Sequence, residues 1–69
     1  MQSTEIPEAL DILHNRIQAT KQEIIYWQRQ QLLRTERDAR IQAGARVLIW
    51  ESQLRVLSAQ LQQTLTQAA

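Results

Sequence analysis

Residues 10–27 read LDILHNRIQATKQEIIYW, and this stretch decides the fold class because its apolar residues recur at alternating spacings of three and four. That spacing places them on one side of a helix, in the heptad pattern of helices that pack side by side. We call this set the first seam, in which Thr20 takes the one place without an apolar side chain. The same spacing extends back to Ile6, so its large apolar members are Ile6, Leu10, Leu13, Ile17, Ile24 and Trp27.

A second seam follows in residues 43–65, where the same spacing recurs. Its large apolar members include Val47, Trp50, Leu54, Leu57 and Leu61. Residues 28–46, between the two seams, show a weaker apolar pattern. The centres of the seams lie about 140° apart around a straight helix, so one partner cannot contact both. The chain is therefore expected to turn between them.

The composition favours an all-α chain. The 69 residues include one glycine and one proline, and Gln, Leu, Ala, Ile and Arg, which are mostly good helix formers, dominate. We predict a single helical domain over residues 1–69, an antiparallel two-helix coiled-coil hairpin. Its helices are expected over about 6–34 and 37–67, with a turn within 33–44. Because so short a chain buries a small core and has no cysteine for a disulfide, we expect assembly into a four-helix bundle.

The local signal for the turn is weak, so an alternative fold stays open. Thr35 and Asp38 resemble a capping box that would begin the second helix, but residues 16–43 contain no glycine, proline or asparagine. The alternative is one continuous long helix in an antiparallel coiled-coil dimer. In both folds the pairing is centred on Arg37, because folding there brings the bulky clusters at 24–27 and 47–50 together.

The sequence gives no indication of catalysis. Cysteine is absent, which excludes thiolate chemistry, and the only histidine, His14, lies one residue off the first seam. The carboxylates are spread along the chain without a facing pair. We therefore expect no enzymatic activity, no cofactor and no metal site.

Charge and hydropathy are unremarkable. Eight Lys and Arg residues against seven Asp and Glu give a net charge of +1. The longest uninterrupted apolar run, residues 47–50, is far shorter than the roughly 20 residues that cross a bilayer. We expect a cytoplasmic protein without a membrane span.

The seams and clusters predict a protein that works by helix packing. Because the clusters are apolar around the whole helix, Ile25, Leu48 and Ile49 point away from the seams. Ordinary core packing is the simpler interpretation of the clusters, and an exposed patch for a partner is the functional one. We expect a non-enzymatic protein–protein interaction or assembly module that packs against a second copy, a larger protein, or both. The predicted interface consists of Leu10, Leu13, Ile17, Ile24, Ile25, Trp27, Val47, Leu48, Trp50, Leu54, Leu57 and Leu61.

The arginines between the seams indicate an alternative function. Arg34, Arg37 and Arg40 recur every three residues, a spacing suited to contact with phosphates or with an acidic protein surface. Glu36 and Asp38 interrupt this strip, so a solvated helix face is the simpler interpretation. The alternative is a small nucleic-acid-binding protein that uses the Arg-rich segment 29–46.

Overall fold

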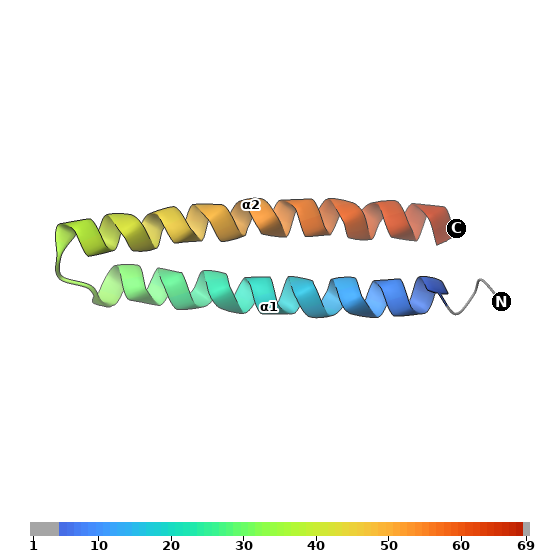
Figure 1. The fold of residues 1–69 in the computed structure, drawn as a ribbon, viewed down its shortest axis with the longest axis horizontal. Coiled ribbons are helices and arrows are strands. Elements are labelled where there is room, and N and C mark those ends of the chain that lie inside the picture. The colour runs from blue at the N-terminus through green and yellow to red at the C-terminus, as the bar shows by residue number, and fades with distance from the viewer. Residues whose placement is uncertain (1–4, 69) are drawn as a thin grey trace.

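The structure, a computed structural model, describes residues 5–68 and consists of two helices in an antiparallel hairpin (Figure 1). Helix α1 spans Glu5–Leu33 and helix α2 spans Arg37–Ala68. The all-α helical hairpin is confirmed, and the alternative of one continuous helix is wrong because the helix stops before residues 34–36. Residues 1–4 and 69 of the predicted domain lie outside the described residues.

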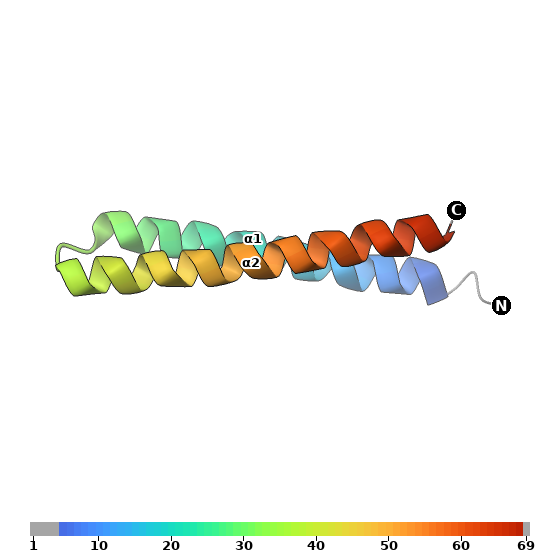
Figure 2. The same cartoon turned by 90° about the horizontal axis from the view of Figure 1, so that it is seen from above.

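The two helices lie side by side along their length and cross at a shallow angle (Figures 1 and 2). Their Cα atoms span 55 × 14 × 11 Å. Both ends of the described chain lie at one end of this rod, which we call the open end, and the turn lies at the other (Figure 1). The rod is two helices thick in one direction and one helix thick in the other, so each helix keeps an outer surface that its partner does not cover.

The turn is formed by residues 34–36. The Arg34 N–H donates to the Gln30 carbonyl at 3.0 Å, and the Arg40 N–H donates to the Glu36 carbonyl at 3.0 Å. Glu36 therefore takes the N-cap position of α2, one residue after Thr35, where the sequence pattern places the cap. None of residues 5–68 has a positive φ, so this turn does not need the glycine that is missing from it.

A small apolar core holds the hairpin together near the open end. Leu13, Ile17 and Leu57 form its buried centre, and the half-buried Leu54 and Leu61 pack against them. Full burial of a large aliphatic side chain contributes about 1.5 to 3 kcal/mol, so these residues supply much of the hairpin's stability.

Thr20 extends this core toward the middle of the hairpin. It is only 4% exposed, and its Oγ1 donates a hydrogen bond of 2.7 Å to the Arg16 carbonyl one turn earlier. Because the hydroxyl is satisfied within its own helix, a threonine occupies the vacant place in the first seam without leaving a buried polar atom unpaired.

The two helices are in register about a point near Arg37. A Cβ atom added at Gly44 would lie 3.0 Å from Gln31 Nε2, so these residues face each other. The Arg46 guanidinium lies over the Trp27 ring, 5.6 Å from its centroid. In each of these pairs, the midpoint between the two residue numbers lies within one residue of position 37. The helices therefore pair in the register that the clusters at 24–27 and 47–50 predict.

Candidate interaction surface

The hairpin divides into two regions that bury different kinds of side chain. We call residues 8–23 and 51–67 the core segment, and residues 24–50 the turn segment. In the core segment large aliphatic side chains are buried. In residues 28–46 of the turn segment, the buried and half-buried positions carry small or polar residues: Gln30, Arg34, Ala39, Ala43 and Gly44. The helices therefore meet near the turn without a large apolar side chain between them.

Most of the large apolar side chains of the turn segment are exposed, whereas Ile24, Trp27, Val47 and Trp50 are buried or half-buried. Leu32 is 86% exposed and Leu33 is 73% exposed. Seven of the ten exposed large hydrophobic residues described belong to this segment, although it is shorter than the core segment. They are Ile25, Tyr26, Leu32, Leu33, Ile41, Leu48 and Ile49. Clustered apolar surface of this kind marks interaction sites in soluble proteins.

Helix geometry places four of these side chains on one face that spans both helices. Leu32 of α1 and Ile41 of α2 line one shallow hollow. Ile25 and Leu48 lie seven residues from them along their helices, and residues seven apart lie within about 20° of each other around a helix. The hollow is also lined by Gln31, Arg37 and Arg40. We call Ile25, Leu32, Ile41 and Leu48 the turn patch.

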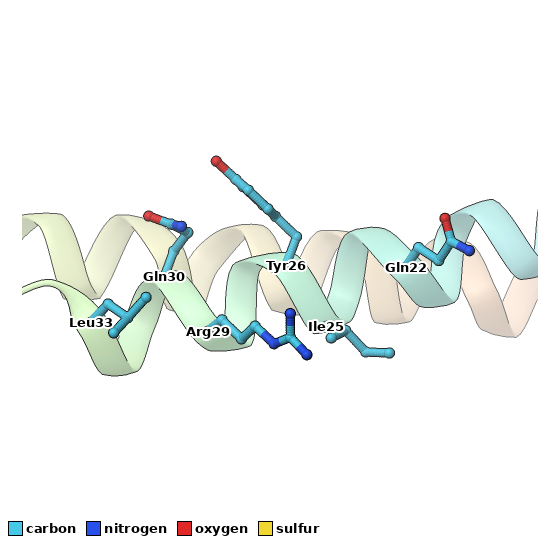
Figure 3. A pocket seen from close by; sticks show the side chains of 6 residues that line it. All are labelled: Gln22, Ile25, Tyr26, Arg29, Gln30 and Leu33. Atoms are coloured by element: carbon cyan, nitrogen blue, oxygen red, sulfur yellow. The ribbon is translucent and has the colours of Figure 1, made fainter.

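A second hollow runs along the outside of α1 (Figure 3). Its lining side chains all come from α1 and are Gln22, Ile25, Tyr26, Arg29, Gln30 and Leu33. In Figure 3 the ring of Tyr26 and the side chain of Ile25 point to different sides of the helix. The apolar surface near the turn therefore wraps around the outer side of α1.

Trp27 connects the seam with this outer surface. It is half-buried, and the Tyr26 ring meets it edge-on at 5.1 Å between centroids and 89° between planes. The guanidinium groups of Arg34 and Arg46 lie over the indole at 5.9 and 5.6 Å from its centroid, and Arg34 Nε donates to Gln30 Oε1 at 3.3 Å. Cation–π contacts of this kind contribute about 0.5 to 1 kcal/mol at exposed sites, so arginines continue the packing where the apolar seam ends.

The three arginines of the predicted anion contact lie in two different environments. Arg34 is half-buried and covers Trp27. Arg37 and Arg40 are exposed and flank the hollow that Leu32 and Ile41 line. Their positive charges therefore border the turn patch, whereas the Arg34 guanidinium is engaged within the hairpin.

The predicted interface residues fall into two groups. Ile25 and Leu48 are exposed, at 48% and 68%, and belong to the turn patch. Sequence reasoning did not find Leu32 and Ile41, although their signal is present: each lies one heptad from Ile25 or Leu48. The other predicted interface residues are buried or half-buried: Leu10, Leu13, Ile17, Ile24, Trp27, Val47, Trp50, Leu54, Leu57 and Leu61.

The remaining candidate chemistry is sparse. His14 is exposed on α1. Within the described part of the chain, no three His, Cys, Asp or Glu side chains lie close enough together to hold a metal ion. Over the same residues, neither helix has an apolar stretch of the length that crossing a bilayer requires.

Comparison with known proteins finds no relative: the chain matches no protein-family model, no curated protein and no solved structure.

Proposed function

We propose that this chain is a non-enzymatic protein–protein interaction module, which packs its turn patch against a helix of a partner protein. One observation carries the proposal: in residues 28–46 the large apolar side chains Leu32, Leu33 and Ile41 are exposed, while small and polar residues lie between the helices. The same apolar residues on the inner positions would have stabilised the hairpin directly. Their outward position is explained if another helix covers them.

The size of the turn patch limits the binding free energy that apolar contact alone can supply. Its four side chains are between 48% and 86% exposed, and covering them would contribute about 4 to 8 kcal/mol. Association itself costs about as much, roughly 4 to 15 kcal/mol. The apolar contact alone therefore gives weak binding, and the partner also has to engage polar groups around the patch.

The charges beside the turn patch indicate the chemistry of the partner. Arg37 and Arg40 border the hollow between Leu32 and Ile41. An amphipathic helix with acidic residues beside its apolar positions complements this arrangement, because the opposite charges favour both encounter and orientation. We therefore propose an acidic amphipathic helix as the ligand of the turn patch.

Site-specific photocrosslinking in cells of the native host tests this proposal. A benzophenone side chain is introduced at position 41 in the turn patch, and at position 62 as the control. Gln62 lies three heptads after Ile41 on the same helix and is also exposed, but it belongs to the core segment. We expect a protein adduct of one defined mass from position 41 and none from position 62. The adduct should disappear when Leu48→Asp is added.

The same experiment tests the nucleic-acid alternative. That alternative predicts adducts with DNA or RNA at position 41, lost on Arg37→Ala and Arg40→Ala and strongly reduced by added salt. Equal labelling at positions 41 and 62 would contradict the proposed role of the turn patch.

A further inference from the structure

A second apolar feature runs along α1, away from the turn patch. It consists of residues spaced seven apart, so they follow one side of the helix. Ile12 and Tyr26, which are 53% and 50% exposed, flank the exposed Ala19. We call Ile12, Ala19, Tyr26 and Leu33 the long row. Unlike the turn patch, the long row continues through the core segment.

Helix α2 contributes to the same face. A groove lined by both helices contains Ala19 of α1 and Gln53 of α2. Ile49 lies four residues before Gln53 and Val56 three residues after it, and residues at these spacings are neighbours on a helix surface. Ile49 is 61% exposed and Val56 is 51% exposed. The long row and these two side chains therefore form one apolar face across the hairpin.

The hairpin is electrically polar along its length. The turn segment contains five arginines against Glu36 and Asp38, a net charge of +3. The core segment contains three basic residues against four acidic ones, a net charge of −1. If two copies packed side by side with their turns at the same end, the turn segments, each with a net charge of +3, would lie next to each other and repel. With their turns at opposite ends, each positive turn segment would face a negative core segment.

We propose that the occupant of this face is a second copy of the chain, packed on it with the two turns at opposite ends. A two-fold axis near Ala19 then brings the α1 helices together in opposite directions. Ile12 of one copy faces Tyr26 of the second copy. The exposed Arg16, which lines the groove beside Ala19, faces Glu23 of the second copy, because the two residues lie at equal distances from the axis to within one residue.

The dimensions of the hairpin suit such a dimer. The outline of one face, 55 × 14 Å between Cα atoms, is about 770 Å², so a second copy would have to cover nearly the whole face to bury the roughly 800 Å² per partner of a standard stable interface. This inference rests on the proposed role in helix packing but uses different side chains, so the two can fail separately. The dimer would leave the turn patch of each copy uncovered, one toward each end of the assembly.

Disulfide trapping in the full chain tests the position of the axis. The protein has no cysteine, so Ala19→Cys introduces a unique thiol. We expect this variant to form a disulfide-linked dimer on mild oxidation. The control is Gln18→Cys, at the adjacent exposed residue about 100° around the helix, which should stay unlinked. With the turns together, Ala19 would face α2 of the second copy and would not reach its equivalent, so a dimer without this link overturns the proposed orientation.

A charge exchange tests the pairing across the axis. Arg16→Glu and Glu23→Arg should each weaken dimerisation roughly ten-fold in sedimentation equilibrium, because each change places two like-charged pairs in the interface. The double variant should recover the wild-type dissociation constant. A double variant no tighter than the single ones, or a wild-type chain that stays monomeric at millimolar concentration, overturns the dimer. If either result is found but position 41 still forms protein adducts, the turn patch functions without the dimer.

Discussion

The core segment and residues 28–46 of the turn segment are built from similar helices but bury different kinds of side chain. In the core segment Leu13 and Leu57 are buried, while glutamines cover much of the surface. In the turn segment Ala43 and Val47 are buried, and Leu32 and Leu48 are exposed. The comparison shows that apolar content alone does not tell which part of a hairpin buries its large side chains. We infer that the core segment supplies more of the internal stability, because large aliphatic side chains occupy its buried positions, and we propose that the turn segment supplies the contact surface.

The largest expected difference between the two segments comes from placing a charge in each. Leu57→Asp puts a carboxylate at a position that is 5% exposed, and it should cost about 3 to 5 kcal/mol and abolish cooperative unfolding. Leu48→Asp, at a 68% exposed position, should change the free energy of unfolding by no more than about 0.5 kcal/mol. Thermal melts followed by circular dichroism compare them. Equal destabilisation would remove the distinction between the segments.

A matched pair of leucine truncations measures the same distinction without a charge. Leu13→Ala should cost about 2 to 4 kcal/mol, because it removes a side chain that is 9% exposed and leaves a cavity. Leu32→Ala should be nearly neutral, because its side chain is 86% exposed. Urea unfolding of both variants at a concentration where the wild type is monomeric gives the two free energies. A cost above about 1 kcal/mol for Leu32→Ala would place Leu32 in the hairpin's own core.

Trp27 and Arg34 test how the packing continues beyond the apolar seam. A double-mutant cycle with Trp27→Leu and Arg34→Gln should give a coupling free energy of about 0.5 to 1 kcal/mol, from the guanidinium that lies over the indole. Arg37→Gln in the same cycle is the control, because Arg37 lines the hollow of the turn patch. A coupling of zero for Arg34 would mean that its contact with Trp27 adds no stability.

The smallest expected effect is a gain in stability at Gly44. Alanine is favoured over glycine in a helix interior by about 0.8 to 1 kcal/mol. The added Cβ would meet Gln31 Nε2 at 3.0 Å, the end of a flexible side chain that can move aside. Gly44→Ala should therefore stabilise the hairpin by about 0.5 kcal/mol. A loss of stability in chemical unfolding would show that the helices need the closer approach that glycine allows.

The apolar periodicity of the sequence predicts the two seams. It does not predict the inner positions that polar or small residues occupy. The seams were found because residues such as Leu13 and Leu57 repeat at heptad spacing. The inner positions near the turn were not found, because Gln30, Arg34 and Ala39 carry no apolar signal. The N-cap was placed at Thr35 rather than Glu36, since side-chain preference favours threonine there.

The candidate surface was predictable only in part. Ile25 and Leu48 were identified because they belong to clusters that are apolar around the whole helix. Leu32 and Ile41 lie one heptad from Ile25 and Leu48, which is a signal in the sequence, but only the position of the turn shows that they line one hollow. The contact of Arg34 with Trp27 likewise depends on the position of the turn, so a regular spacing of arginines could not reveal it.

Native-state amide hydrogen exchange on the monomeric chain tests the central claim most directly, because it reports the stability of each segment in one experiment. The claim is that internal stability resides in the core segment and that the turn segment relies on contacts from outside. We expect the amides of residues 13–20 and 54–61 to exchange at least roughly ten-fold more slowly than those of residues 28–33 and 39–46. Equal protection in the two segments, or slower exchange near the turn, would contradict the account.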